Sequence, residues 1–299
     1  MIDLHNHILY GLDDGPETIE ESLDMCRMGY GDGIHTIVAT PHMLNGVYQN
    51  SRAVILSRVQ ELNHALASFP ATGHFRSPGT QAPDGVPSSC PSIRNPESEI
   101  RNSESSLGSS IRNPQSEIRN SQSPLVILPG ADVHLDSELL QELKQDRLVT
   151  LGDGGRFLLI EFPSQGIPFQ AEQILFQLMA MRIKPIITHP ERNLEVRRRP
   201  ERYADMIRSG CLGQVTGMSL TGDFGPEVKQ LAEKMLLHRL VHVIATDSHS
   251  TDGRPPILSK AVKAASKILG RKEAYRMVTE YPRAILEGRK PGTAPPVPL

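Results

Sequence analysis

Short apolar segments alternate with amphipathic segments along most of the chain, in the pattern of repeated βα units. The apolar segments predict seven strands, which begin near Ile2, Ile34, Leu125, Phe157, Pro185, Leu212 and Val241. Helices are predicted between them, near residues 19–30, 53–66, 170–181, 227–237 and 257–269. Thr18 and Glu21 form a capping-box pattern at the start of the first helix.

Most of the predicted strands end at a polar cluster that contains His, Asp or Glu. Repeated βα units with polar residues just beyond the strands predict an α/β barrel whose functional site lies at the C-terminal ends of the strands. An open, doubly wound parallel sheet is the alternative arrangement.

One segment, residues 77–124, departs from this pattern. It contains 13 Ser and 7 Pro but few apolar residues, and it includes the near-copies SIRNPESEIRNS and SIRNPQSEIRNS. Such a composition buries too little apolar surface to fold alone, and two copies are too few for a solenoid. We therefore predict a single barrel domain over 1–299, with a disordered low-complexity insertion at 77–124 and a flexible C-terminal tail at 289–299.

Composition excludes several classes of protein. Lys and Arg number 32 and Asp and Glu 34, so the formal net charge of -2 gives no general footprint for nucleic acid or anionic lipid. Three widely spaced cysteines form no CxxC pair, which argues against a disulfide framework and fits a reducing cytoplasm. We find no apolar run long enough to span a bilayer, and we expect a cytoplasmic protein without stable membrane insertion.

The first strand ends in Asp3-Leu4-His5-Asn6-His7. Because side chains alternate along an extended chain, His5 and His7 point to the same side. Two adjacent imidazoles can hold a metal ion, although paired histidines also occur on exposed strands.

Later strand ends supply further candidate ligands. Asp14 lies on the first βα loop, His42 follows the second strand, and the third, fifth and seventh strands end near Asp132, His189 and the pair Asp247 and His249. The predicted metal ligands are thus His5, His7, Asp14, His42, Asp132, His189, Asp247 and His249. Imidazole and carboxylate ligands suit manganese, zinc or iron, and eight ligands exceed the needs of one ion. Two or three metal ions with a bridging carboxylate are expected, an arrangement suited to phosphoester hydrolysis.

Two arginines give further support to a substrate that carries a phosphate group. Arg192 lies three residues after His189, and Arg254 lies five after His249, so both can reach the same end of the barrel. A guanidinium group matches phosphate oxygens and neutralises their charge. Glu161 also ends a strand, where contact with the site and a simple strand-end cap are equally good interpretations.

The ordered strings DLHNHILYGLDDG, TPH, LLIEFP, THPER, TDSH followed by GRPP, and YPRAI resemble the PHP (polymerase and histidinol phosphatase) superfamily. Within it, they resemble the bacterial metal-dependent protein-tyrosine phosphatases of the CpsB/CapC capsule type. The resemblance covers residues 1–73 and 125–288, with the insertion between them.

This resemblance implies a distorted (βα)7 TIM-like barrel of the PHP type and hydrolysis of phosphotyrosine on protein. It also implies a site of two or three ions, with Mn²⁺ the first expectation and Zn²⁺, Fe²⁺ or Co²⁺ as alternatives. Arg192 and Arg254 would bind phosphate. The implied partner is a tyrosine-phosphorylated protein, a bacterial tyrosine autokinase, in the regulation of capsular or exopolysaccharide synthesis. The sequence leaves a homo-oligomer open.

Two other functions remain open at this point. A phosphatase of the same superfamily could act on a small phosphomonoester such as histidinol phosphate. A non-catalytic binding protein is the third hypothesis, which the intact set of candidate ligands disfavours.

One position departs from the family pattern, because Asp132 stands where the family usually has a bridging Glu. Its side chain is shorter by one carbon–carbon bond, about 1.5 Å. We therefore expect the Asp132→Glu variant to hold more metal, or to turn over faster, than the natural chain. Metal analysis of both purified proteins, paired with phosphate release, checks this; equal content and equal rates would contradict it.

Overall fold

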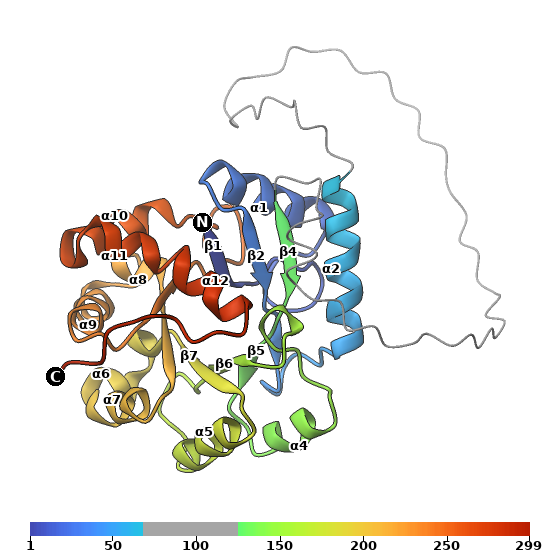
Figure 1. Ribbon diagram of the computed structural model, residues 1–299. Coiled ribbons are helices and arrows are strands. Elements are labelled where there is room, and N and C mark those ends of the chain that lie inside the picture. Colours follow the sequence, from blue (N-terminus) through green and yellow to red (C-terminus); the bar gives the residue numbers. More distant parts are fainter. Residues whose placement is uncertain (68–124) are drawn as a thin grey trace, which may run out of the picture.

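The computed structural model describes residues 1–67 and 125–299, which form a mixed α/β fold (Figure 1). All seven predicted strands are present, two of them in two pieces. Their bounds are β1 Ile2–Asn6, β2 Thr36–Ala39, β3 His42–Met43, β4 Val126–Pro129, β5 Asp132–His134, β6 Phe157–Glu161, β7 Lys184–Thr188, β8 Leu212–Thr216 and β9 Val243–Ala245.

Every strand pair in the described part of the chain is parallel, and the strands fall into two sheets. One sheet has the order β1-β2-β4 and the other β3-β5-β6-β7-β8-β9. The division arises because the second predicted strand breaks at Pro41 and the third at Gly130. Pro41 has no N–H group to donate to a ladder. A Cβ atom at Gly130 would lie 2.7 Å from the Val38 side chain, so only glycine fits this close approach.

The first and last strands meet beyond the end of β9 rather than along a shared ladder. The backbone N–H of Asp247 donates to His5 O (2.8 Å), and that of His7 donates to Ser248 O (2.9 Å). A single parallel bridge joins Asn6 to Ser248. These contacts bring the end of β1, with His5 and His7, beside the turn that carries Asp247 and His249.

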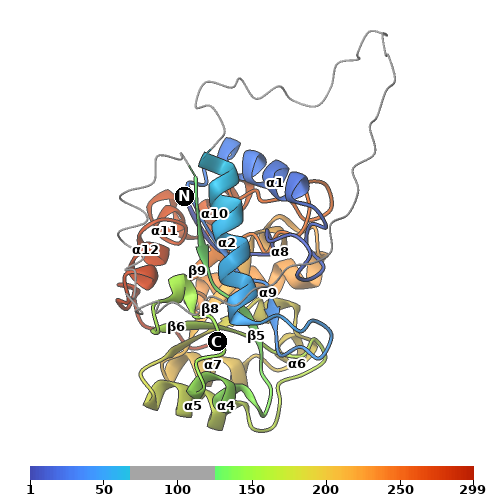
Figure 2. The ribbon, with the colours of Figure 1, turned by 90° about the vertical axis from the view of Figure 1, so that its right-hand side faces the viewer.

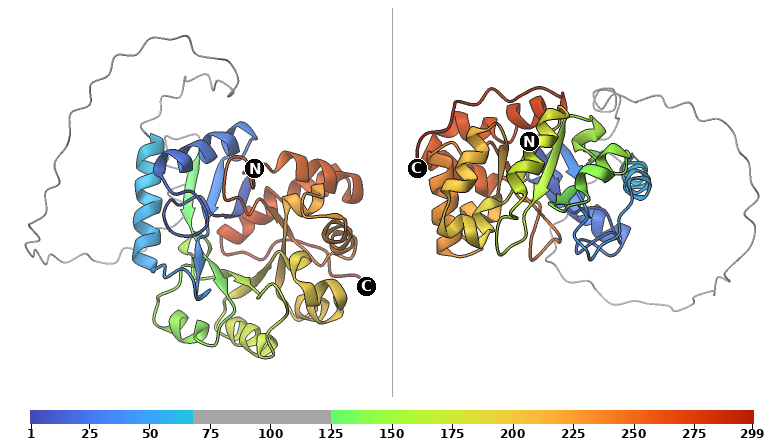
Figure 3. Two further views of the ribbon diagram at one scale, coloured as in Figure 1. Left: turned by 180° about the vertical axis from the view of Figure 1, so that it is seen from behind. Right: turned by 90° about the horizontal axis from the view of Figure 1, so that it is seen from below.

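Helices lie around the outside of the strands, as the views in Figures 1, 2 and 3 show. The five predicted helices are confirmed, with ends that differ by two residues at most. The helices are α1 Ile19–Gly31, α2 Arg52–Ala67, α4 Leu139–Lys144, α5 Ala171–Ala180, α6 Leu194–Arg198, α7 Glu201–Arg208, α8 Gly217–Thr221, α9 Pro226–Leu237, α10 Ser259–Leu269, α11 Arg271–Arg276 and α12 Glu280–Leu286, with 3-10 turns η1 Leu151–Asp153 and η2 Pro190–Arg192.

The capping box predicted for α1 is present. The Glu21 N–H donates to Thr18 Oγ1 (3.3 Å), and the Glu21 carboxylate accepts from the Thr18 N–H (3.3 Å). Among the described helices, none is both long and apolar enough to cross a bilayer.

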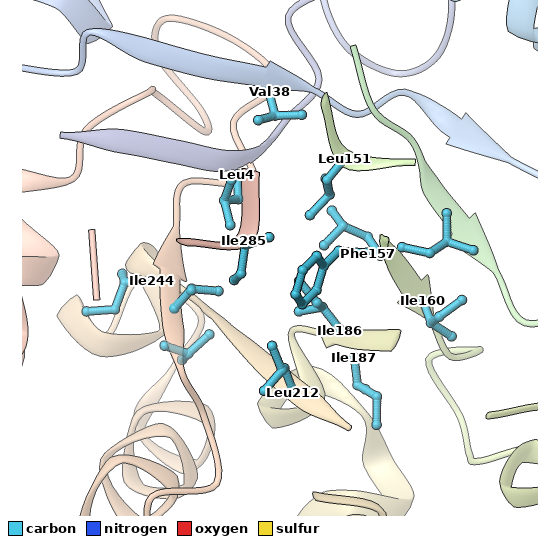
Figure 4. Close-up of a cluster of buried hydrophobic side chains, with 14 of the residues drawn as sticks. Leu4, Val38, Leu151, Phe157, Ile160, Ile186, Ile187, Leu212, Ile244 and Ile285 are labelled. Carbon is cyan, nitrogen blue, oxygen red and sulfur yellow. The ribbon is translucent and has the colours of Figure 1, made fainter. Parts of the chain in front are cut away.

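The apolar core fills the space between the strands and the helices. Figure 4 shows Leu151 from η1 and Ile285 from α12 among strand side chains such as Leu4, Phe157 and Ile244. All five are almost completely buried. Phe157 is the first residue of β6, so this packing supports the strands from the end opposite their C-terminal ends.

The sequence predicts a disordered insertion and a flexible C-terminal tail, and the structure describes only the tail. The predicted insertion, residues 77–124, lies outside the described residues. In the tail, residues 289–299 form neither helix nor strand. The Val297 N–H donates to His238 O (2.9 Å), and Leu299 packs against the core. The end of the chain is thus held against the end of α9.

Asp32, at the end of α1, caps the start of α10. Its carboxylate accepts hydrogen bonds from the backbone N–H groups of Leu258 (2.7 Å) and Ser259 (2.8 Å). Since the loop before α10 carries His249 and Arg254, this cap fixes the end of a segment that bears candidate site residues.

The Asp32→Ala variant should lose about 1 to 2 kcal/mol of unfolding free energy, because two N–H groups at a helix start lose their acceptor. Urea unfolding followed by circular dichroism measures this loss. The control is Asp24→Ala on the same helix, whose exposed ion pair with Arg27 should contribute less than about 0.5 kcal/mol. Equal losses in the two variants would contradict the capping role.

Candidate metal centre and phosphate site

The eight predicted ligands gather at the C-terminal ends of the strands, around one cavity of about 350 Å³. Asp14, His42, His189, Asp247 and His249 line the cavity, as do both predicted arginines, Arg192 and Arg254. His5, His7 and Asp132 lie deeper and are completely buried. The structure thus brings together every candidate site residue that the sequence predicts.

The paired histidines of β1 aim at one point, as alternation along the strand predicts. His5 Nε2 and His7 Nε2 lie 3.1 Å apart. Asp247 Oδ1 lies 3.4 Å from the first and 3.5 Å from the second. Burial lowers the pKa of His5 to about 3, so its imidazole is neutral and can donate a lone pair to a metal ion.

Three of the imidazoles are oriented by an acceptor at Nδ1. His5 Nδ1 lies 3.0 Å from Gln214 Oε1, and His7 Nδ1 lies 2.7 Å from Asp13 Oδ2. His249 Nδ1 lies 3.0 Å from the carbonyl oxygen of Asp247. An N–H at Nδ1 leaves the lone pair on Nε2, which is the arrangement of histidines that bind metals.

Asp13 acts on the charge of His7 as well as on its orientation. Burial alone would lower the pKa of His7, but the carboxylates of Asp13 and Asp247 together outweigh it and raise that pKa to about 10, so a cation that binds at Nε2 displaces a proton from it. Asp13 Oδ2 also accepts the backbone N–H of His42 (3.1 Å). One carboxylate therefore positions two candidate ligands from different strands.

Asp132 provides the test of whether these residues fit a metal ion. Both of its carboxylate oxygens are buried, and neither accepts a hydrogen bond within the described residues. Oδ2 lies 3.4 Å from His5 Nε2, 3.8 Å from His42 Nδ1 and 3.9 Å from His189 Nε2. Burial raises the pKa of Asp132 to about 8, and the nearby Glu161 carboxylate adds to the increase. A buried carboxylate without a donor is costly, and a cation among the imidazoles would remove that cost.

Glu161 belongs to the same cluster, which resolves the two interpretations left open by the sequence in favour of contact with the site. Its carboxylate lies 3.4 Å from His42 Nδ1 and 3.7 Å from His189 Nε2. His134 Nδ1 is 3.6 Å away. Burial raises the pKa of Glu161, but the neighbouring histidines His134 and His42 more than reverse this and lower it.

On the open side of the cluster, Asp14 completes a further group. Asp14 Oδ1 lies 3.3 Å from His249 Nε2 and 3.6 Å from His42 Nε2. The rings of His7 and His249 stack with centroids 3.9 Å apart. His42 thus presents Nε2 to Asp14 and Nδ1 to Glu161.

Within the described residues, three sets of side chains could each hold an ion, since their ligand atoms lie within 4.8 Å of one another. These sets share members, which matches the expectation of more than one ion and a shared carboxylate. They are His7, Asp14, His42 and His249; His5, His7 and Asp132; and His42, Asp132 and Glu161.

Two candidate ligands have left-handed backbone conformations. The φ angle is 33° at His189 and 52° at Asp247. Such angles are uncommon outside glycine and cluster at functional sites. They turn the chain sharply where β7 and β9 end, so that both side chains face the cavity rather than continue along the sheet.

The two arginines converge on Asp247. Arg192 NH2 lies 2.6 Å from Asp247 Oδ2, and Arg254 NH2 donates to the same oxygen. Burial raises the pKa of Asp247, but the positive charge of Arg192, with contributions from the neighbouring histidines and Arg254, outweighs it and holds that pKa well below its usual range. Two guanidinium groups at one cavity wall are chemically suited to bind a phosphate group.

Sequence reasoning missed several residues of the site. Asp13, Gln214 and His134 are not among the residues that the sequence predicts for the site, yet each contacts one of its side chains. A polar residue on a buried strand, such as Gln214 on β8, is the signal that could have singled it out.

Comparison with known proteins matches the chain to one family. A family profile described as "Capsular polysaccharide synthesis, CpsB/CapC" matches residues 1–74 and 91–287. The tyrosine-protein phosphatase YwqE of Bacillus subtilis is 29% identical over 299 residues, which are 100% of this chain and 96% of that protein. The tyrosine-protein phosphatase CpsB of Streptococcus pneumoniae is 28% identical over 291 residues, which are 96% and 98% of the two chains.

Solved structures agree with the sequence matches. A chain from the crystal structures of YwqE from Bacillus subtilis and CpsB from Streptococcus pneumoniae, described as metal-dependent tyrosine phosphatases, superposes with a TM-score of 0.77. It is 29% identical, and the match covers 100% of this chain and 99% of that one.

Replacement of Asp13 by Asn should weaken the binding of Mn²⁺ to the metal-free protein by about 10-fold to 100-fold, because His7 loses its charged acceptor. Calorimetric titration with Mn²⁺ measures this change. The matched control is Asp205→Asn, an exposed carboxylate on α7. Affinities of the two variants within about twofold of each other would contradict the positioning role of Asp13.

Proposed function

Because the chain belongs to the CpsB/CapC family of capsular polysaccharide synthesis proteins, we propose that it is a metal-dependent phosphatase that hydrolyses phosphotyrosine on protein. The observation that carries the proposal is the meeting, at one cavity, of overlapping metal-binding sets with two arginines. The first feature suits divalent ions and the second suits the phosphate group.

The proposed ligands are the eight residues predicted from the sequence, to which the geometry adds Glu161. Mn²⁺ is the expected ion, in two or three copies, with Zn²⁺, Fe²⁺ and Co²⁺ as alternatives. When bound, such ions would supply Lewis-acid catalysis and positive charge beside the phosphoryl group.

Arg192 and Arg254 are proposed to bind the phosphoryl oxygens. In the structure their guanidinium groups lie on Asp247 Oδ2 at the cavity wall, so each has N–H groups within reach of a bound phosphate. A pair of positive charges held in a partly buried site stabilises the negative charge of a phosphoryl group in transfer.

The walls of the cavity also fit the tyrosine ring. Phe162 and Pro190 add apolar surface to the cavity lining, together with the polar side chains of Ser164 and Asn193. The phosphate of phosphotyrosine lies a full aromatic ring away from its backbone, so a cavity lined by both apolar and charged groups suits it.

We further propose that the strands form a distorted (βα)7 barrel of the PHP type. The parallel order of the strands and the bridge between Asn6 and Ser248 support this proposal. The substrate is proposed to be a tyrosine-phosphorylated protein, a bacterial tyrosine autokinase, and the setting to be the cytoplasmic regulation of capsular or exopolysaccharide synthesis. The description of the family, capsular polysaccharide synthesis, supports the role in polysaccharide synthesis.

The direct test supplies the purified protein with Mn²⁺ and measures phosphate release from a phosphotyrosine peptide. We expect His5→Ala to reduce the rate to background, because it removes a buried candidate ligand. Arg254→Ala should lower kcat/KM by about 100-fold to 1,000-fold while its metal content stays unchanged.

Arg197→Ala is the matched control for the arginine variant, since Arg197 forms an ion pair with Glu227 away from the cavity. It should retain its rate within about twofold. Full activity of His5→Ala would refute the proposal. A higher kcat/KM for histidinol phosphate than for the peptide would instead favour a phosphatase of small phosphomonoesters.

A further inference from the structure

An exposed aromatic side chain, Phe169, lies on the loop between β6 and α5. Phe169 is 94% exposed, the largest fraction among the exposed large apolar residues of the described chain. The same loop contributes Phe162 and Ser164 to the cavity wall. An exposed apolar residue beside a functional site differs from one scattered on an ordinary surface, because a macromolecular substrate must pass over it.

The loop is held firmly in place. Asn193, which lines the cavity, donates through Nδ2 to Pro163 O (2.8 Å) and Gly166 O (3.0 Å). The Ile167 N–H donates to the Glu195 carboxylate (2.8 Å). Gly166 is therefore in direct contact with a residue of the cavity wall.

An arginine from α7 fixes the residues on both sides of Phe169. Arg202 donates to Ile167 O (2.9 Å) and Pro168 O (2.9 Å), and also to the carboxylate of Glu172 (2.7 and 2.9 Å). The exposure of Phe169 is thus set by a well-bonded backbone rather than by a loose loop.

Distance places Phe169 within reach of a bound polypeptide. Phe169 lies three positions after Gly166, a span of at most roughly 11 Å. Four extended residues of a substrate span about 13 Å, so side chains about four positions from the phosphotyrosine can contact Phe169. A second exposed aromatic, Phe176, is 68% exposed and lies on α5, seven positions after Phe169.

We propose that Phe169, with Phe176, binds apolar side chains that flank the phosphotyrosine of the protein substrate. This inference rests on the proposed function and adds a sequence preference to it. The occupant is the substrate polypeptide because the phosphate must enter the cavity, so the chain that carries it must cover the adjoining loop. The charged groups of Arg192 and Arg254 in the cavity serve the phosphate. Phe169 would add apolar contact with the residues on either side of the phosphotyrosine.

The experiment compares three substrates on the Mn²⁺-loaded full chain: free phosphotyrosine, a phosphotyrosine peptide with Leu four positions away on each side, and the same peptide with Ser there. The natural protein should prefer the Leu peptide. Phe169→Ser should lower kcat/KM for the Leu peptide by roughly fivefold to tenfold and leave free phosphotyrosine unchanged. Phe176→Ser should show a smaller loss of the same kind.

The control is Leu237→Ser, which removes a 57% exposed apolar side chain at the end of α9 and should change none of the three rates. Equal rates for the Leu and Ser peptides, or an equal loss on free phosphotyrosine, would overturn the proposal. A natural protein that is dimeric by light scattering, and monomeric as Phe169→Ser, would assign the patch to self-association instead. No hydrolysis of any substrate would contradict the proposed function itself, and this proposal with it.

Discussion

The buried carboxylate of Asp3 joins the first and last strands, and the candidate site depends on that joint. Oδ1 accepts the backbone N–H groups of Thr246 (3.0 Å) and His5 (3.4 Å), and Oδ2 accepts the Asn6 amide (2.9 Å) and the Thr246 hydroxyl. Since β1 and β9 share no ladder, these bonds hold the His5 strand beside the turn that presents Asp247. A buried carboxylate that accepts four hydrogen bonds is both satisfied and hard to displace.

Beside these bonds of Asp3, the fold holds many polar groups in one buried cluster. His5, His7 and Asp132 are completely buried, which a protein interior allows only when polar groups are paired or bind an ion. Gln214 and Asp13 accept at the Nδ1 atoms of His5 and His7. The Nε2 atoms of these imidazoles point into the cluster, as do both oxygens of Asp132, which have no hydrogen-bond donor among the described residues. Hydrogen bonds to Gln214 and Asp13 thus orient the cluster from outside, while inside it the Nε2 atoms of His5 and His7 lie 3.1 Å apart and the Asp132 oxygens have no donor in the described part of the chain, where cations fit.

The sequence was sufficient for what depends on local pattern. The seven strands and the His5 and His7 pair follow from apolar periodicity and alternation. The C-terminal ends of parallel strands lie on the same side of a sheet, so residues that follow them are expected together. It did not predict the break of the strands at Gly130, which results from the approach of the Val38 side chain across the sheet. Nor did it predict that Gln214 orients His5, since that contact joins residues 209 positions apart. Such contacts depend on packing between strands, for which a single sequence carries no local signal.

Asp247 shows how the two halves of the site are combined in one side chain. Its Oδ1 faces the imidazoles of His5 and His7, and its Oδ2 faces Arg192 and Arg254. A carboxylate shared with two guanidinium groups is a weaker electron donor than a free one, because those charges stabilise its electron pairs. In the proposed function, a phosphate group that draws the arginines toward itself would leave Asp247 a stronger ligand for a cation. The proposed anion-binding and cation-binding sides thus meet at one carboxylate, and any coupling between them would be reciprocal.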